Sequence, residues 1–383
     1  MSKVRVGIIG IGNMGSKHAI TIDNGAINEA ELSAVCDVNE AALDWATKHL
    51  NENINLYHDA DSFLHSKNID AVIIATPHYD HPGLAIKSFA RGYHVLVEKP
   101  AGVYTEQVEK MNEAAKSSGK VFGIMYNQRT NPVYRKIKEL VEEGELGEIK
   151  RINWIVTDWY RPQCYYDSGD WRATWSGEGG GVLINQCPHQ LDLLQWICGM
   201  PKRVRAFMSF GKYHNIEVED DVTAYMEYEN GATGVFITST AEAPGTNRLE
   251  ITGDKGKIVL EDNKLAFYRL RMPERIFNQE SKTGFGSPEC WKCEVPVKGE
   301  ITSHKGIIQD WINGISTGKK LLAPSEEGIK GLTISNAMHL SAWTDKFVEI
   351  PLSSDLYYKE LMSKIQNSKK RIPLKVIDMM KSY

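Results

Sequence analysis

The chain has 383 residues, more than one hydrophobic core usually serves, so two domains are expected. Hydrophobic residues make up 42% and charged residues 25%, which excludes a largely disordered protein. The net charge of -4 without a basic stripe argues against nucleic acid as a partner, and no apolar run reaches the roughly 20 residues of a membrane span. The N-terminus lacks a secretory signal pattern, so we expect a cytoplasmic protein that does not bind a membrane.

The N-terminal part of the chain alternates short apolar runs with amphipathic segments. The runs predicted to be buried strands are VRVGIIG, ELSAVCD, AVIIAT, HVLVEK and VFGIMY. Because each crossover between parallel strands is a helix, this alternation predicts an α/β fold with a doubly wound parallel sheet. We expect a Rossmann domain that binds NAD over residues 1–125.

A glycine pattern follows the first run and opens a helical segment. It consists of Gly10, Ile11, Gly12, Asn13, Met14 and Gly15, and this context is the one that a dinucleotide fingerprint requires. Gly10 permits the tight turn, Gly12 lets the backbone approach a pyrophosphate, and Gly15 lets helix and strand pack closely. We expect the six residues to contact the cofactor.

Asp37 ends the second apolar run. A carboxylate at this place can accept hydrogen bonds from the adenosine ribose hydroxyls, and it would repel a 2′-phosphate. No Arg or Lys follows within the next few residues to receive such a phosphate. The sequence therefore predicts NAD rather than NADP. The alternative is an aspartate that only begins a turn.

From about Glu148 the pattern changes to longer alternating strands. They lie in KRINWIVTDWY, RVRAFMSFGK, DVTAYMEYENGATGVFITST, RLEITGDKGKIVLED and KLAFYRLR, with hairpin turns at Asn230-Gly231 and Gly253 to Gly256. Helical patterns cover 181–198, 305–316 and 325–342, whereas 270–300 and the polar tail after about residue 365 have no clear pattern. Residues 126–383 are expected to form an α+β domain for substrate binding and oligomerisation. Its sheet is open and mostly antiparallel with helices on one face, and its C-terminal segment can pack back on the first domain.

The six cysteines lack the dense spacing of a disulfide scaffold, so reduced thiols are expected. Cys290 and Cys293 form a C-x-x-C without a second pair, in a segment that is predicted to be irregular. A redox or zinc role for this pair is a minor alternative. We predict no metal site.

Three further motifs follow the fingerprint in chain order. They are Thr76, Pro77 and His78 with His81, then Glu98, Lys99 and Pro100 at the end of HVLVEK, then Gly179 to Asp192 with Asn185 and His189. Together these motifs resemble the glucose–fructose oxidoreductase/inositol dehydrogenase (Gfo/Idh/MocA) family. The resemblance implies an active site in the cleft between the two domains, with Glu-Lys-Pro at the nicotinamide. It also implies cofactor contacts from Thr76, Pro77, His78, His81, Glu98, Lys99, Asn127 and Arg129.

Lys99 and His189 are the predicted catalytic residues. A hydride that leaves a carbinol carbon must be matched by loss of the hydroxyl proton, so the site needs a base and a cation. Many relatives carry an aspartate where this chain has Asn185, and a neutral amide binds hydroxyls but cannot take a proton. On a predicted helix Asn185 and His189 share a face, which leaves His189, with an ordinary pKa near 6.5, as the expected base. Asp192 either orients the imidazole or is a structural carboxylate.

Further substrate contacts are expected from an aromatic and charged stretch, Asp158, Tyr160, Arg161, Trp171 and Arg172. Aromatic faces stack on pyranose rings, and Arg or Asp pairs with adjacent hydroxyls. The alternative is a set of core aromatic residues beside an ordered loop.

The sequence therefore predicts an NAD(H)-dependent oxidoreductase that transfers a hydride between nicotinamide and a ring secondary alcohol of a sugar or glycoside. Oxidation at C3 is suggested by the resemblance alone. Three alternatives stay open: a cyclitol dehydrogenase, a redox-assisted glycosidase or lyase with tightly bound NAD, and a non-catalytic NAD or sugar sensor. The open sheet face is expected to be substantially apolar, so we predict a homodimer or homotetramer through this sheet.

Overall fold

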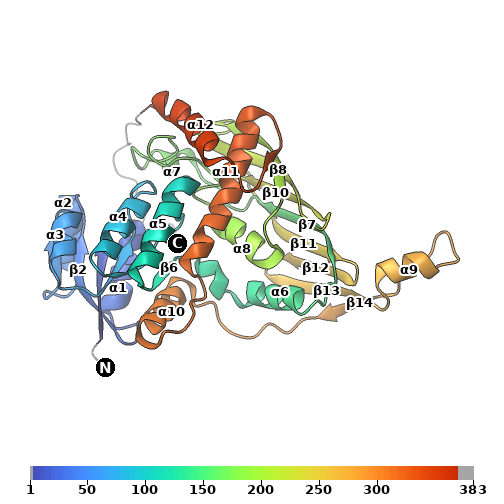
Figure 1. Cartoon of the computed structure of the whole chain (residues 1–383), viewed down its shortest axis with the longest axis horizontal. Helices are drawn as coiled ribbons and strands as arrows, with labels where there is room; N and C mark the ends of the chain where they lie inside the picture. The colour runs from blue at the N-terminus through green and yellow to red at the C-terminus, as the bar shows by residue number, and fades with distance from the viewer. Residues whose placement is uncertain (1–2, 370–383) are drawn as a thin grey trace.

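The computed structural model describes residues 3–369 and contains two β-sheets (Figure 1). Residues 370–383 of the predicted polar tail lie outside the described part. The first sheet has six parallel strands in the order β3-β2-β1-β4-β5-β6. They are β1 (Val4–Ile9), β2 (Ala30–Cys36), β3 (Asn55–Tyr57), β4 (Ala71–Ile74), β5 (His94–Val97) and β6 (Phe122–Ile124), with helices α1 (Asn13–Asp23), α2 (Glu40–His49), α3 (Ala60–His65), α4 (Asp80–Ala90) and α5 (Thr105–Ser118). The predicted doubly wound sheet is confirmed.

Burial explains why most of these strands were visible in the sequence. All of β4 is buried, and so is β5 after its first residue, because helices cover the sheet on both sides. The short strand β3 was missed because it has two exposed residues and no apolar run. The strand order reverses between β1 and β4, and ligands bind beyond the carboxyl ends of strands at such a reversal.

The second sheet has nine strands in the order β14-β13-β12-β11-β7-β10-β9-β8-β15. They are β7 (Ile149–Val156), β8 (Arg203–Phe210), β9 (Glu219–Glu227), β10 (Thr233–Ser239), β11 (Asn247–Gly253), β12 (Gly256–Glu261), β13 (Lys264–Leu270), β14 (Cys290–Glu294) and β15 (Val348–Glu349). Among the described strands of this sheet only β7 and β10 pair in parallel, so the predicted open, mostly antiparallel sheet is confirmed. The remaining helices are η1 (Asn127–Thr130), α6 (Pro132–Glu142), α7 (Gln163–Tyr166), α8 (Pro188–Cys198), α9 (Glu274–Glu280), α10 (Ser303–Thr317), η2 (Ser325–Glu327), α11 (Gly328–Thr344) and α12 (Ser354–Gln366). Within residues 3–369, none of the helices combines the length and the apolar character needed to cross a membrane.

The C-x-x-C pair lies in strand β14, so the predicted irregular segment is wrong at this point. The strand forms because its backbone pairs with β13, with Cys290 opposite Leu270 and Cys293 opposite Phe267. Residues three apart on a strand point to opposite faces, so these two thiols do not face each other. Among the described residues, no group of three or more His, Cys, Asp or Glu side chains is arranged to hold a metal ion.

The predicted helix over 181–198 begins only at Pro188. Residues 181–187 form turns instead, because the buried Glu219 carboxylate accepts the N–H groups of Gly181 (2.9 Å) and Leu183 (3.0 Å). A Cβ on Gly181 would lie 2.1 Å from the Glu219 carbonyl oxygen, so this loop is held tightly against β9. Proline is favourable in the first turn of a helix, and here it marks the start of α8.

A buried ion pair connects η1, which follows the last strand of the first sheet, with helix α8. Arg129 of η1 donates to Asp192 of α8 through Nε (2.8 Å) and Nη2 (2.6 Å), and its Nη1 lies 2.5 Å from a Glu327 oxygen of η2. Arg129 is 0% and Asp192 1% exposed, so the structure gives both a structural role, and their predicted cofactor and substrate contacts stay predictions. Helix α10 adds apolar contact, because Ile308 and Trp311 belong to the core of the first sheet.

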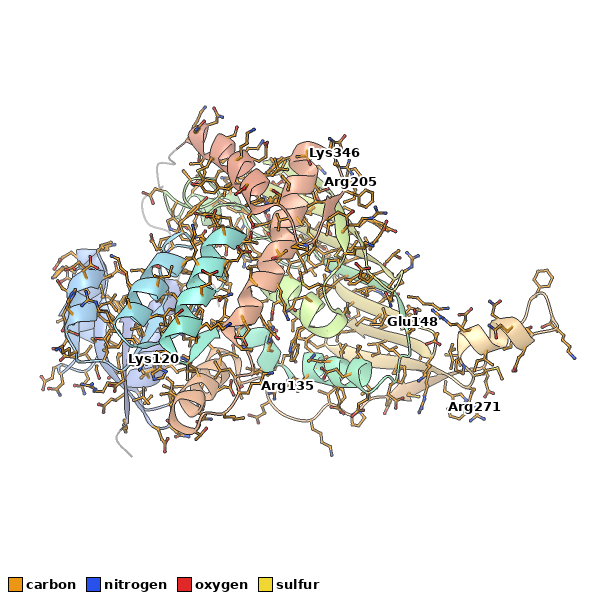
Figure 2. All side chains as sticks on the ribbon, viewed as in Figure 1. Lys120, Arg135, Glu148, Arg205, Arg271 and Lys346 are labelled. Carbon is orange, nitrogen blue, oxygen red and sulfur yellow. The ribbon has the colours of Figure 1, made fainter. Side chains whose placement is uncertain are left out.

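The open face of the second sheet is mixed in character, not substantially apolar as predicted. Ile155, Val235 and Ile237 are partly buried along its centre. Ion pairs such as Arg203 with Glu227 (2.8 Å) lie on the same sheet. Charged side chains lie around both halves of the molecule, as Lys120, Arg205 and Arg271 show in Figure 2. Association through this face stays a prediction.

We predict that Arg129→Met lowers the free energy of unfolding by about 3–5 kcal/mol, because it leaves the Asp192 carboxylate buried without its cationic partner and with only the neutral Gln195 amide donating to it. Urea denaturation followed by circular dichroism measures the change. Arg203→Met is the matched control, since its partner Glu227 lies at a partly exposed site where such pairs contribute at most about 1 kcal/mol. Equal losses in the two variants would contradict the assigned role of Arg129.

Candidate active site

A pocket of about 1570 Å³ lies beyond the carboxyl ends of β1, β4 and β5. The predicted residues that line it are Gly10, Gly12, Asn13, Met14, Asp37, Thr76, Pro77, His78, His81, Glu98, Lys99 and Asn127 from the first half, and Tyr160, Arg161, Trp171, Arg172, Asn185 and His189 from the second. Ile11, Gly15, Arg129, Asp158 and Asp192 are predicted site residues that do not line it. Both halves of the chain thus contribute walls to one cleft.

The three glycines of the fingerprint have different surroundings. Gly10 has a φ of +92°, and a Cβ there would lie 2.6 Å from the Ala75 carbonyl oxygen. A Cβ on Gly15 would lie 1.8 Å from the Gly10 carbonyl oxygen, so Gly15 allows helix α1 to pack against the turn. Gly12 has no heavy atom within 4 Å of an added Cβ, which leaves its pocket side open to a ligand.

Asp37 is fixed by two backbone hydrogen bonds. Its Oδ2 accepts from the N–H of Ile11 (2.7 Å) and its Oδ1 from the N–H of Asn39 (2.8 Å). Each carboxylate oxygen keeps a further acceptor position, and Asp37 lines the pocket. Ile11 is buried and acts through this bond, which is why it does not line the pocket itself.

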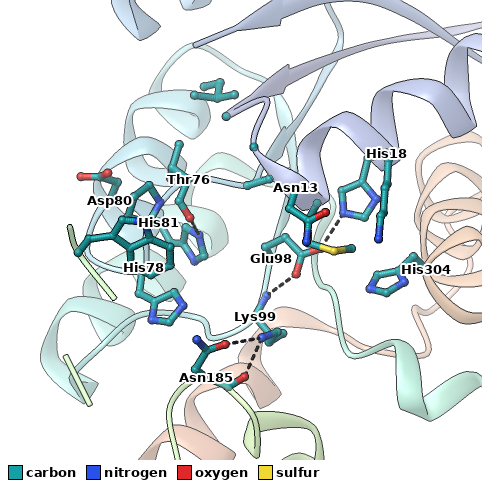
Figure 3. A pocket seen from close by; sticks show the side chains of 18 of the residues that line it. Asn13, His18, Thr76, His78, Asp80, His81, Glu98, Lys99, Asn185 and His304 are labelled. Atoms are coloured by element: carbon teal, nitrogen blue, oxygen red, sulfur yellow. Dashed lines mark hydrogen bonds and ion pairs between the residues drawn. The ribbon is translucent and has the colours of Figure 1, made fainter. Parts of the chain in front are cut away.

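Glu98 forms a buried pair with a histidine that the sequence analysis missed. Its Oε1 lies 2.7 Å from Nε2 of His18, on α1, and its Oε2 accepts from the N–H of Lys99 (3.1 Å) (Figure 3). Burial alone raises the pKa of Glu98, but the hydrogen bond and charge of His18 outweigh it and lower the pKa to about 2. His304 of α10 lies close by, with its ring centroid 5.6 Å from that of His18. The two histidines stand far apart in the sequence and outside the motifs, so only the fold brings them together.

Lys99 reaches across the cleft from the end of β5. Its Nζ donates to the backbone oxygen of Asn185 at 2.8 Å and lies 3.5 Å from the Oδ1 of the same residue (Figure 3). Burial lowers the pKa of Lys99 from its ordinary value, and the charges of Glu98 and Glu178 oppose that shift. A lysine with a lowered pKa can lose its proton closer to neutral pH.

His189 lies in the first turn of α8 and is 8% exposed. Its Nδ1 is buried without a hydrogen-bond partner in the described part of the chain. Burial, and then the charge of Lys99, lower the pKa of His189 to about 3, so the imidazole is neutral at working pH. This environment removes the ordinary pKa near 6.5 on which the expectation of a histidine base depended. Asp192 does not orient this ring, because both of its carboxylate oxygens bind Arg129.

Asn185 lies in the turn before α8 and not on the helix, so the predicted shared helix face with His189 is wrong. Both residues still line the pocket. The Asn185 Nδ2 donates to the hydroxyl of Tyr165 (3.1 Å) and to the Glu178 carboxylate. Sequence reasoning missed Tyr165 and Glu178, although Tyr165 falls in the aromatic stretch and Glu178 directly precedes three glycines.

The substrate side of the pocket contains stacked arginine and aromatic side chains. The guanidinium carbon of Arg172 lies 4.7 Å from the ring centroids of both Tyr165 and Trp171, and that of Arg161 lies 5.2 Å from the Tyr165 ring. Tyr160 is half exposed at the pocket wall. This wall can offer a flat apolar face together with hydrogen-bond donors.

Asp158 is directed elsewhere, because it accepts from Asn247 Nδ2 (3.2 Å) on β11, beside the strand it follows. Asp158 does not line the pocket, and its substrate contact stays a prediction.

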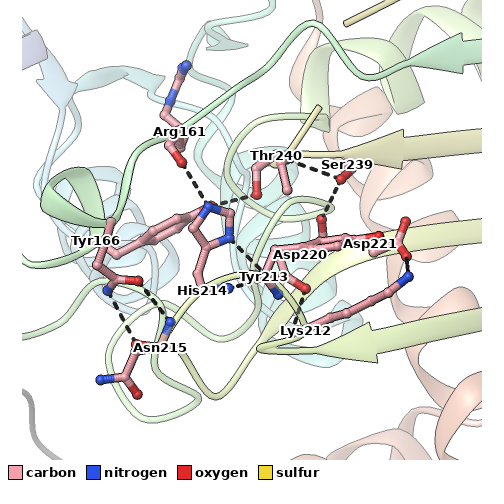
Figure 4. Close-up of polar contacts among 12 residues, drawn as sticks. Arg161, Tyr166, Lys212, Tyr213, His214, Asn215, Asp220, Asp221, Ser239 and Thr240 are labelled. Atoms are coloured by element: carbon pink, nitrogen blue, oxygen red, sulfur yellow. Dashed lines mark hydrogen bonds and ion pairs between the residues drawn. The ribbon is translucent and has the colours of Figure 1, made fainter. Parts of the chain in front are cut away.

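A buried histidine anchors the loop that contains Arg161. His214 Nε2 donates to the backbone oxygen of Arg161 (2.8 Å), and its Nδ1 lies 3.1 Å from Asp220 Oδ2 (Figure 4). Asp220 is 0% exposed and also accepts backbone N–H groups of Lys212 (3.1 Å) and Tyr213 (2.9 Å). This network ties one pocket wall to the start of β9.

Comparison with known proteins gives two matches that cover most of the chain. A family model described as the oxidoreductase family with an NAD-binding Rossmann fold (GFO/IDH/MocA) matches residues 4–126, and the model of the GFO/IDH/MocA C-terminal domain matches residues 134–259.

Relatives and solved structures agree with this match. The uncharacterized oxidoreductase YdgJ of Escherichia coli is 30% identical over 321 residues, 81% of this chain and 89% of YdgJ. The D-glucoside 3-dehydrogenase of E. coli is 29% identical over 372 residues, 91% of this chain and 98% of the relative. The WlbA dehydrogenase of Bordetella pertussis, solved in complex with NADH and UDP-GlcNAcA, superimposes with a TM-score of 0.79 at 26% identity and covers 92% of this chain and 100% of WlbA. This chain therefore belongs to the Gfo/Idh/MocA family of oxidoreductases with an NAD-binding Rossmann fold.

Proposed function

We propose that this protein transfers a hydride between NAD and a secondary alcohol, or the corresponding ketone, on the ring of a sugar or glycoside. The proposal depends on one observation above all: Lys99 and His189 line the same pocket as the glycine turn of the first sheet. The names of relatives support the substrate class, since one is a D-glucoside 3-dehydrogenase and another, at 26% identity, a myo-inositol 2-dehydrogenase. The first of these supports C3 of a glycoside as the oxidised position.

The residues of the cleft fit NAD. Gly12 leaves room at the start of α1, where the helix dipole favours a pyrophosphate, and the Asp37 carboxylate has acceptor positions free for ribose hydroxyls. Thr76 Oγ1 is buried at the pocket without a protein partner within the described residues, so a ligand can satisfy it. When bound, the nicotinamide supplies the hydride acceptor for alcohol oxidation.

Lys99 is the better candidate for the base. The pKa of His189 near 3 makes its imidazole a weak base, whereas burial brings the pKa of Lys99 down from its ordinary value. Neutral Lys99 takes the hydroxyl proton during oxidation, and its ammonium returns the proton during ketone reduction. His189 then holds the reacting hydroxyl by a hydrogen bond. Asn185, Tyr160 and the stacked Arg172 bind the rest of the sugar ring.

The function can be tested by mixing the purified protein with NAD and a panel of pyranosides, free sugars and cyclitols. We expect NADH to accumulate, as measured by its absorbance, with at least one pyranoside. Release of the aglycone without net NADH would replace the proposal with a redox-assisted glycosidase. Cytoplasmic location and homo-oligomer formation stay predictions from the sequence.

We predict that Lys99→Met and His189→Ala each lower turnover by more than about 100-fold, the usual scale for a lost proton-transfer group or oxyanion contact. In the wild type, alcohol oxidation should rise as the pH increases through the lowered pKa of Lys99, because only the neutral amine accepts a proton. Lys120→Ala, outside the pocket, is the control. Near-normal turnover in both pocket variants would refute the role assignment.

Asp37→Ser should weaken NADH binding by about tenfold or more, since a charged acceptor for the ribose hydroxyls is lost. NADPH binding should change less or improve, because the repulsion of a 2′-phosphate is removed. Fluorescence titration with both nucleotides measures the two affinities without any substrate. An unchanged preference for NADH would show that Asp37 does not select the cofactor.

Two glycine variants should show that Gly15 is needed for stability and Gly12 for NADH binding. Gly15→Ala should lower the free energy of unfolding by at least about 2 kcal/mol, because the added methyl group meets the Gly10 carbonyl oxygen. Gly12→Ala should leave stability within about 1 kcal/mol and weaken NADH binding, because its methyl group points into the open pocket. Thermal unfolding and fluorescence titration distinguish the two effects. The reverse pattern would contradict the assignment of the two glycines.

A further inference from the structure

Glu178 is a buried carboxylate directly behind the pocket wall. It is 1% exposed, precedes the three glycines of the loop and does not line the pocket. One carboxylate oxygen accepts the N–H of Ala173 at 2.6 Å, and the other accepts from Asn185 Nδ2. The Glu178 backbone oxygen is 3.1 Å from Nδ1 of His78. The carboxylate thus faces the amide of Asn185.

These contacts fix the orientation of the Asn185 side-chain amide. Its nitrogen has two oxygen partners, the Glu178 carboxylate and the Tyr165 hydroxyl at 3.1 Å. A carboxylate can only accept, so the nitrogen must be on that side and Oδ1 on the other. Oδ1 then faces the Nζ of Lys99 at 3.5 Å. A chain of donors and acceptors runs from Lys99 through Asn185 to Glu178.

We propose that Glu178, acting through Asn185, supplies the negative charge that holds the Lys99 ammonium in the pocket. It thereby replaces the aspartate that many relatives are expected to carry at position 185. Glu178 is a positioning residue, since it reaches the reacting atoms only through Asn185. The inference rests on the proposed function of Lys99 as the group that exchanges a proton with the substrate.

The charges around Lys99 support this role. Burial lowers the pKa of Lys99, the carboxylates Glu98 and Glu178 raise it, and the guanidinium groups of Arg172 and Arg161 lower it. The nearby imidazoles His78, His189 and His304 have lowered pKa values, first because they are buried, and so they contribute no positive charge near neutral pH. Without Glu178, Glu98 would be the main carboxylate that counters these cations. Glu98 is already paired with His18.

Glu178 could instead only brace the loop through its bond to Ala173. In that case its replacement would lower stability but leave the titration of Lys99 unchanged. Glu219 offers a matched control, because it is a buried carboxylate that holds the same loop through Gly181 and Leu183. It is not among the largest influences on the pKa of Lys99.

The test is competitive labelling of lysine amines with acetic anhydride over a pH series, with the Lys99 peptide quantified by mass spectrometry. Glu178→Gln should move the titration midpoint of Lys99 down by about one pH unit, the usual size of one nearby charge. Glu178→Gln with Asn185→Asp should return the midpoint towards the wild-type value, since the charge is restored one residue closer. Glu219→Gln should lower the unfolding temperature and leave the midpoint in place.

An unchanged midpoint in folded Glu178→Gln would overturn the proposal. If Glu178→Gln does not fold, the double variant Glu178→Gln with Asn185→Asp tests the proposal instead. A folded double variant with a near wild-type midpoint shows that the site needs the charge, whereas an unfolded one shows that the loop needs Glu178 itself and contradicts the inference. The labelling uses no substrate, so it is independent of turnover. If Lys99 proves dispensable for turnover but its midpoint shifts as expected, the proposed function fails, whereas the contribution of the Glu178 charge to the Lys99 ammonium is still demonstrated.

Discussion

The buried pair of Arg129 and Asp192 is the constraint on which the relation of the two sheets depends. Each group is almost completely removed from water, so each requires the other, and the two-bond geometry fixes orientation as well as distance. Arg129 follows the last strand of the first sheet, and Asp192 lies one turn beyond His189 on α8. The ion pair therefore fixes the start of α8 relative to the end of β6. If one sheet moved relative to the other, Arg129 would separate from Asp192, and the shape of the pocket would change at the same time.

The chemistry of the cleft follows from this docking. A parallel sheet presents Lys99 at a strand end, beside the glycine turn, and cannot by itself enclose a substrate. The second sheet contributes a loop whose oxygen atoms meet the Lys99 ammonium. Burial of that ammonium between the halves lowers its pKa and moves it closer to the range in which proton transfer is efficient. The fold thus influences the reactivity of Lys99 through the burial of its ammonium group in the cleft.

Local patterns were enough to predict both sheets and the glycine turn. A strand buried on both faces is a continuous apolar run, a strand buried on one face alternates, and the turn has its own glycine spacing. Local patterns were not enough where a residue far away in the sequence determines the backbone conformation, the hydrogen-bond partner or the pKa. The N–H groups of residues 181 and 183 bind Glu219 instead of continuing a helix, Asp192 binds Arg129 instead of His189, and the environment of His189 moves its pKa far from 6.5. Glu178 and Tyr165 belong to no motif, and they matter only because the fold brings both to Asn185.

The chain leaves the second sheet at the end of β7 and returns to it at the start of β8, so residues 157–202 form one long excursion. Every substrate-facing residue assigned to the second half, from Tyr160 to His189, lies within it. An excursion of this kind can be lengthened, shortened or exchanged while the ladder hydrogen bonds of the strands stay as they are. Changes within one continuous stretch of the gene could therefore alter the substrate that is accepted while the cofactor-binding residues stay the same, and a protein engineer could exchange the same stretch between relatives.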